Sequence, residues 1–138
     1  MRDIKFRIYD KLSGKVIYIT GFRYVNNSNR IKYTLIDRYG DACTYTSERS
    51  EIEIMQYTGQ HDRNGKEIYE GDLVIIPVED EQEAVKIEWD NDSSRFVFSA
   101  RTYTCDFDSY GGEDCEVVGN IYDNFEQDEL QHWKRKYR

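Results

Sequence analysis

The sequence predicts a mainly β protein of antiparallel hairpins, with a small barrel in its second half and a short C-terminal helix. Three observations lead to this fold class. Apolar and polar residues alternate over many short segments, which is the period of a strand with one solvated face. Gly, Asn, Asp and Ser gather between these segments, where turns are needed. The last fifteen residues instead have the charge pattern of a capped helix.

The first third of the chain predicts two hairpins and a further strand. A strand over 4–9 returns over 16–19 after a Ser-Gly turn. A second hairpin spans 22–25 and 31–36, on either side of an Asn-rich cluster whose side chains favour turns by bonding to nearby backbone. Residues 43–46 are rich in β-forming side chains and predict the next strand.

The middle of the chain predicts a longer series of strands. The segment 73–76 is apolar on both faces and is therefore the expected most buried strand. Two further hairpins are expected, each formed by strands that flank a polar loop. The predicted strands are 52–56 and 73–76, then 85–89 with 96–98 as the third hairpin, and 102–107 with 116–120 as the fourth.

The C-terminal segment 123–138 predicts a short amphipathic helix. Asn124 is a suitable N-cap with Gln127 at the reciprocal position, acidic residues follow in the first turns, and basic residues end the segment. With one proline and no readable repeat, we expect one compact domain over 1–138. Its possible subdivisions are the N-terminal hairpins (1–50), the central motif and barrel (51–122) and the helix (123–138).

The net charge of −8 is unevenly distributed. Residues 1–38 contain nine Lys or Arg and three Asp, a balance of +6, so the remainder carries −14. Tyrosines are interleaved with the basic residues, a mixture that suits base stacking or a protein interface as well as an ordinary half-buried strand face. The candidate interaction surface consists of Arg7, Tyr9, Tyr18, Arg23, Tyr24, Lys32 and Tyr33.

Cysteine usage and hydropathy suggest where the protein works. The three cysteines include no Cys-x-x-Cys pair, and their odd number argues against a closed disulfide framework. Reduced thiols are expected, with Cys105 and Cys115 as small buried residues rather than a bridge. No apolar run has the length of a membrane span. We therefore expect a cytoplasmic protein that does not engage a membrane.

Three segments of the chain have the form of a family signature. The first is 4–10 (IKFRIYD), and the third is 118–124 (VGNIYDN). The central one is the longest, and its recurring residues are Gln56, Tyr57, Thr58, Gly59, Asp62, Asn64, Gly65, Ile68, Tyr69, Glu70, Gly71 and Asp72. Together these segments resemble the YopX family of phage and prophage proteins, in which a Pro often stands at the position of Phe125, directly after the third segment. The resemblance implies a compact β-rich accessory protein of a mobile element, and it assigns no catalytic residue. The expected cytosol is then that of the host cell.

The residues of the central segment also predict a structural role. Asp62 to Gly65 is expected to form the tight turn at the tip of a central hairpin, because Asn-Gly accepts positive φ. Gly71 is expected to take a conformation closed to other residues, and Asp72 to accept bonds from free backbone amides. The step from Gly71-Asp72 into an apolar strand is similar to the opening of an SH3-like barrel, a fold analogy that carries no function.

No residue set has the spacing of a known catalytic, cofactor or metal site. His61-Asp62 is an adjacent pair like those of metal phosphohydrolases, but the further His and Asp ligands are missing. Three hypotheses follow: a non-catalytic binding or interaction module, nucleic-acid binding through the basic N-terminal hairpins, and an enzyme with a site near Asp62, Glu70 and Asp72. The first is favoured.

The charge asymmetry also predicts assembly. Oppositely charged surfaces of two copies attract each other. The residues near Arg7, Arg23 and Lys32 of one copy are therefore expected to dock on the acidic loops 79–83 and 108–114 of another. Such a contact is heterologous and closes into a ring or small oligomer. Protein partner, second copy and nucleic acid are therefore the alternatives for the basic surface.

Overall fold

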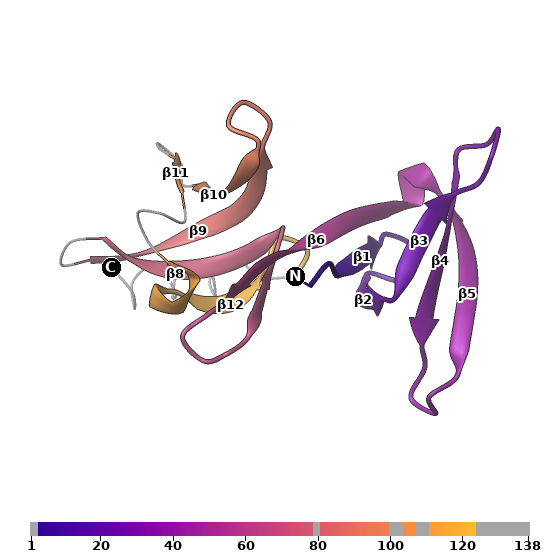
Figure 1. Ribbon diagram of the computed structural model, residues 1–138, viewed down its shortest axis with the longest axis horizontal. Coiled ribbons are helices and arrows are strands. Elements are labelled where there is room, and N and C mark those ends of the chain that lie inside the picture. The colour runs from indigo at the N-terminus through magenta and orange to yellow at the C-terminus, as the bar shows by residue number, and fades with distance from the viewer. Residues whose placement is uncertain (1–2, 79–80, 100–103, 107–110, 124–138) are drawn as a thin grey trace. The chain divides into compact units, whose positions relative to one another are not determined.

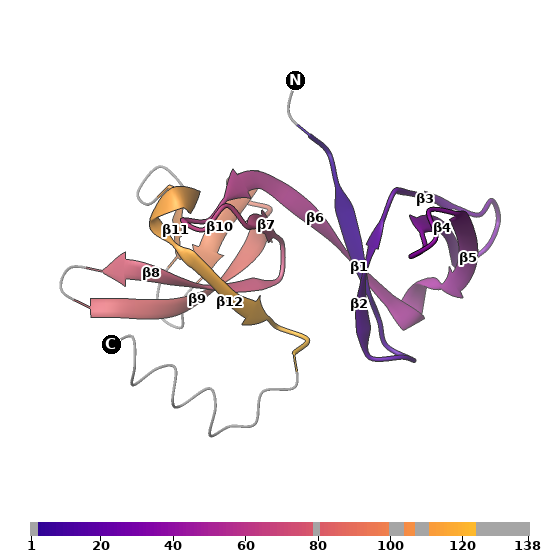
Figure 2. The same cartoon turned by 90° about the horizontal axis from the view of Figure 1, so that it is seen from below.

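The chain divides into two compact units, and the boundary between them falls inside one strand (Figure 1). The structure is a computed structural model, and it describes residues 3–78, 81–99, 104–106 and 111–123. Unit 1 comprises Met1–Tyr57 and unit 2 comprises Thr58–Arg138. The strand β6 (Ile52–His61) begins in unit 1 and ends in unit 2 (Figure 2). The expected subdivision at 50 and 122 stays a prediction.

Unit 1 contains two antiparallel sheets. In one, β1 is central, with β2 on one side and β6 on the other, and Ile8 faces Ile17 and Ile54. The other has the order β3-β4-β5. The strands are β1 (Phe6–Asp10), β2 (Lys15–Ile19), β3 (Gly21–Tyr24), β4 (Arg30–Ile36) and β5 (Ala42–Glu48), and the 3-10 turn η1 (Arg49–Glu51) leads into β6.

The core of unit 1 forms where one face of each sheet is apolar. Alternation places Ile8 on one face of β1, and Ile31 and Tyr33 on one face of β4. Phe6 and Phe22 add an edge-to-face contact with ring centroids 5.0 Å apart. The buried cluster is Ile8, Ile19, Ile31, Tyr33 and Ile52, with Phe6, Ile17, Phe22, Leu35 and Ile54 packed against it.

Unit 2 is a curved five-stranded antiparallel sheet that forms a half-barrel, with the order β11-β10-β9-β8-β12. The short strand β7 pairs with β6. A register shift between Val117 and Gly119 makes an irregularity in β12. The strands are β7 (Glu67–Tyr69), β8 (Asp72–Val78), β9 (Glu81–Asp90), β10 (Arg95–Ser99), β11 (Thr104–Asp106) and β12 (Glu116–Asn120), and a 3-10 turn η2 (Gly112–Asp114) precedes β12.

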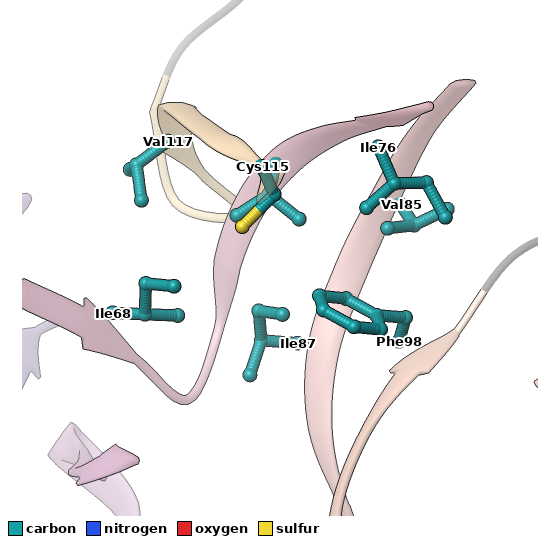
Figure 3. Close-up of a cluster of buried hydrophobic side chains, with 8 residues drawn as sticks. Ile68, Ile76, Val85, Ile87, Phe98, Cys115 and Val117 are labelled. Carbon is teal, nitrogen blue, oxygen red and sulfur yellow. The ribbon is translucent and has the colours of Figure 1, made fainter. Parts of the chain in front are cut away.

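The core of unit 2 lies on the concave side of this sheet (Figure 3). Val74 and Ile76 are fully buried, which confirms that β8 is a buried strand. Among the residues that the structure describes, Phe98 is the largest side chain with no exposure. The cluster consists of Ile68, Val74, Ile76, Val85, Ile87, Phe98, Cys115 and Val117.

Most predicted hairpins are confirmed, and one is wrong. The hairpins β1–β2, β3–β4 and β9–β10 form as expected. The predicted pairing of 102–107 with 116–120 does not occur, because β11 pairs with β10 while β12 crosses to pair with β8. Turn signals identify strand ends but not the distant partner of a returning strand.

The mainly β, antiparallel class is confirmed, in the form of a half-barrel. The predicted C-terminal helix lies in 124–138, outside the described residues. The parts of the chain that the structure describes contain no helix that is long and apolar enough to cross a bilayer.

Candidate interaction surface and signature turns

The first signature turn joins β6 to β7 at Asp62. The N–H of Asp62 donates to the carbonyl of Lys66 at 2.8 Å, and the N–H of Gly65 donates to the carbonyl of Asp62 at 3.0 Å. Gly65 has φ +80°, a conformation in which a side chain is strained. Asn64-Gly65 therefore closes the tight turn that the sequence predicted.

The carboxylate of Asp62 is the centre of this turn. Its Oδ1 accepts the backbone N–H groups of Asn64 (2.8 Å) and Lys66 (2.9 Å), and its Oδ2 accepts the N–H of Val117 at 2.9 Å. Asp62 is only 4% exposed. Burial acts to raise the pKa of this carboxyl, but the hydrogen bonds from the three amides hold the pKa below its ordinary value of 3.8. Asp62 is thus an ionised anchor that ties the turn to β12.

The chain before β12 packs closely on the same turn. Arg63 donates its N–H to the carbonyl of Cys115 at 2.9 Å, and its guanidinium pairs with Glu116. A Cβ placed on Gly112 would lie 2.8 Å from the carbonyl oxygen of His61, closer than side chains tolerate. Glycine is therefore required where η2 meets the end of β6.

The second signature turn, Gly71-Asp72, joins β7 to β8. Asp72 Oδ2 accepts the N–H of Tyr69 at 2.8 Å, and Gly71 has φ +86°. The N–H of Gly71 donates to the carbonyl of Ile87, and its carbonyl accepts the N–H of Ile121. The predicted roles of Gly71 and Asp72 are confirmed: this turn joins β9 to the residues that follow β12.

The other signature residues lie in β6 and β7 or directly beside them. Thr58 donates its hydroxyl to the carbonyl of Ile68 at 2.8 Å. Gly59 also has positive φ, at +89°. Tyr57, Ile68 and Tyr69 are buried, while Gln56 and Glu70 are half-buried.

The carboxylates of Asp62 and Asp72 bind the backbone of the signature turns. The hypothesis of an enzyme site at Asp62, Glu70 and Asp72 requires a carboxylate that is free to transfer a proton. Asp62 and Asp72 instead accept backbone amides in buried turns. Among the described residues, no group of three or more His, Cys, Asp or Glu side chains is placed to hold a metal ion.

The candidate interaction surface of unit 1 divides into buried and exposed side chains. Arg7 is 3% exposed and Tyr33 belongs to the core, so neither is accessible to a partner. Tyr9 and Lys32 are half-buried. The exposed members are Tyr18, Arg23 and Tyr24.

A groove of about 290 Å³ lies beside Tyr24 in unit 1. The guanidinium of Arg49 lies 5.5 Å from the centroid of the Tyr24 ring, a cation–π contact. Lys11 forms an ion pair with Glu53 at 3.2 Å. The groove is lined by Lys11, Tyr24, Ile31, Arg49, Ser50, Ile52, Glu53 and Ile54, so it combines apolar, aromatic and cationic walls.

A second, shallower depression of about 210 Å³ lies on β3 and β4. Arg23 and Lys32 are directly opposite each other in the register of these strands. Like charges at such positions repel, so this pair is stabilised when an anion lies between them. The depression is lined by Gly21, Phe22, Arg23, Lys32 and Thr34.

Comparison with known protein families identifies the chain. The sequence pattern of the family described as YopX protein matches residues 5–127. The chain belongs to the YopX family. A search of the curated proteins finds no match.

One solved structure has a fold similar to that of this chain. The crystal structure of protein EF1440 from Enterococcus faecalis is similar with a TM-score of 0.56 at 21% sequence identity. The similarity covers 90% of this chain and 96% of that chain. At this identity the likeness concerns the fold alone.

Sequence reasoning missed the partners of the YopX signature. Val117 and Gly112 lie in a segment that was predicted to be an acidic loop and a hairpin strand, yet they contact the turn at Asp62. The third family segment also docks on this region, since Ile121 donates its N–H to Gly71. The Gly111-Gly112 pair was the available signal, because glycine often marks close approach of two backbones.

Proposed function

We propose that this YopX protein is a non-catalytic binding protein, an accessory protein of a mobile element, whose partner binds unit 1. One observation carries the proposal: the buried signature carboxylates Asp62 and Asp72 accept backbone amides. Exposed aromatic and cationic side chains meanwhile line the groove beside Tyr24. We therefore assign a structural role to the signature, and we assign binding of the partner to unit 1.

The walls of the groove define the chemistry of the partner. Ile31 and Ile52 form an apolar floor, and they are almost fully buried. Tyr24 is 55% exposed and offers an aromatic wall, while Arg49 has no carboxylate partner among the described residues. An extended protein segment with an apolar side chain next to a carboxylate fits these walls, because Arg49 binds the acid while the floor takes the apolar group.

The test compares two tyrosines that have the same chemistry. Tyr24 lines the groove beneath Arg49, whereas Tyr39 is 74% exposed outside it, with the guanidinium of Arg38 at 4.9 Å from its ring centroid. Partners captured from host cells by the wild-type protein are identified, and their affinity is measured by calorimetry. Tyr24→Ala is expected to weaken binding about tenfold or more, since an aromatic contact is lost, and Tyr39→Ala to leave it unchanged. Equal binding by both variants would refute the groove as the site.

Nucleic-acid binding is the second candidate, favoured by the opposed cations Arg23 and Lys32. When a single-stranded nucleic acid binds, the logarithm of the binding constant falls linearly with the logarithm of the salt concentration. Each phosphate bound at these side chains contributes about −0.7 to this slope. Fluorescence anisotropy with a labelled oligothymidine measures this slope. Arg23→Gln with Lys32→Gln is expected to reduce it, and the exposed Lys15→Gln serves as the control. Absence of oligothymidine binding at low salt removes this candidate.

We propose that the protein performs this function in the host cytosol, and that the half-barrel of unit 2 belongs to an SH3-like barrel. The proposed location rests on the cysteine pattern, and the proposed barrel rests on the order of strands in unit 2. Small barrels of this kind serve many unrelated partners, so the analogy adds no named ligand.

A further inference from the structure

The strand β5 forms one edge of the β3-β4-β5 sheet in unit 1 (Figure 1). It is seven residues long and pairs with β4 along its whole length without a register shift. The N–H of Arg49 donates to the carbonyl of Asn29, and the N–H of Asp37 donates to the carbonyl of Asp41. These two bonds fix which residues of β5 are hydrogen-bonded to β4.

Hydrogen-bonded pairs recur at every second residue of an antiparallel ladder. Since positions 41 and 49 bond toward the β4 side, the odd-numbered residues of β5 bond to β4. The N–H and C=O groups of the even-numbered residues consequently point away from the sheet. These residues are Ala42, Thr44, Thr46 and Glu48.

Proteins normally protect such an edge with Lys, Pro, a bulge or a very short strand. The other edge strands among the described residues follow this rule: β7 and β11 have three residues each and β3 has four. The pairing of β12 is interrupted by a register shift, and β2 starts with Lys15. In contrast, β5 contains no Lys, Arg or Pro and carries β-forming Thr44, Tyr45 and Thr46. No strand of the described residues pairs with its outer edge, so this edge is available to another strand.

We infer that β5 pairs with β5 of a second copy of this chain, antiparallel and about a two-fold axis at Tyr45. In this register each outward-facing residue meets another: Thr44 opposes Thr46 of the second copy, and Ala42 opposes Glu48. All the outward N–H and C=O groups of the strand then have partners at once. The contact is isologous, so it closes at a dimer and joins the two three-stranded sheets into one.

The charges at the two ends of β5 fit the same register. Asp41 precedes the strand and Arg49 follows it, so the two-fold places Asp41 of one copy opposite Arg49 of the other at both ends. The side chain of Asp41 is exposed. Opposite charges at facing positions stabilise a strand pair, whereas a parallel arrangement would bring Asp41 beside Asp41. This isologous contact differs from the head-to-tail docking expected from the overall charge asymmetry, and Arg49 is the residue that it shares with the groove beside Tyr24.

Amide hydrogen exchange followed by NMR tests the pairing directly. In dilute solution the amides of the odd-numbered residues of β5 are expected to be protected, and those of Thr44, Thr46 and Glu48 to exchange rapidly. At millimolar concentration the even-numbered amides become protected as light scattering reports a doubled mass. A monomer at millimolar concentration, or a dimer in which these amides stay unprotected, would overturn the inference.

Charge reversal provides the second measurement. Asp41→Arg alone is expected to weaken the dimer about tenfold, because it places two Arg side chains at each end. The double variant Asp41→Arg with Arg49→Asp restores it. Asp92→Arg makes the same charge change at an exposed turn of unit 2 and is expected to leave the dimer unchanged. A double variant as weak as the single one contradicts the proposed register.

Discussion

The carboxylate of Asp62 accepts the backbone N–H of Val117 at 2.9 Å, although the two residues are 55 positions apart in the chain. The same side chain closes its own turn through two further amides. One buried anion thus connects the β6–β7 turn to β12. Both the local β6–β7 turn and its long-range contact with β12 therefore depend on the carboxylate of Asp62.

Asp62→Asn should therefore destabilise the protein strongly. The substitution keeps one acceptor oxygen but places an NH₂ group or a weaker acceptor among three N–H donors. We expect a loss of about 2–3 kcal/mol, since buried bonds to a charged group are lost or left unsatisfied. Urea unfolding measures it. Asp92→Asn, at an exposed turn, is the control and should change stability little.

Stability should also fall in acid because of Asp62. Its folded-state pKa lies below the ordinary value of 3.8, so its contribution is fully present above that value and is lost as pH falls through the lower, folded-state pKa. Unfolding curves recorded from neutral pH down through this range should converge for the wild type and Asp62→Asn. A gap between them that persists in strong acid would show that the ionised form is not the stabilising one.

Gly71→Ala should destabilise by about 1–3 kcal/mol, because φ +86° is strained for any residue with a side chain. The backbone cannot relax easily, since both its N–H and its carbonyl are hydrogen-bonded. Gly21→Ala is the matched control: a Cβ there meets nothing within 4 Å and φ is not in the left-handed region. Thermal unfolding of the two variants compares them, and equal melting temperatures would contradict the role of Gly71.

The thiol of Cys115 should resist labelling in the folded protein. Burial, followed by the charges of Asp62 and Asp114, raises its pKa to about 12, and the thiol donates to the carbonyl of Gly112 at 2.9 Å. Thiolate is the reactive form, so Cys115 should react with a disulfide reagent only after unfolding. The half-buried Cys43 should react earlier. Counting labelled thiols by mass spectrometry in a Cys105→Ser background separates the two, and early labelling of Cys115 would show that unit 2 opens locally.

The sequence by itself determined the strands, the turns and the family. Alternating apolar residues, Asn64-Gly65 and Gly71-Asp72 express local rules, because side-chain period and positive φ are properties of short segments. The predicted hairpins β1–β2, β3–β4 and β9–β10 followed from these rules. Each of these hairpins joins two strands that are consecutive in the sequence, so closeness along the chain determined which strands pair.

Only the tertiary structure decided what lies far apart in sequence. The partner of β12 is β8 rather than a neighbouring strand, and the third amide on Asp62 comes from Val117. The burial of Arg7, a basic residue that the sequence placed on the surface, was equally hidden from composition. Strand pairing and burial depend on which faces meet when the whole chain packs, and no short segment encodes that. For this reason the sequence predicted the signature turns correctly, while the open edge of β5 became visible only once the strand order was known.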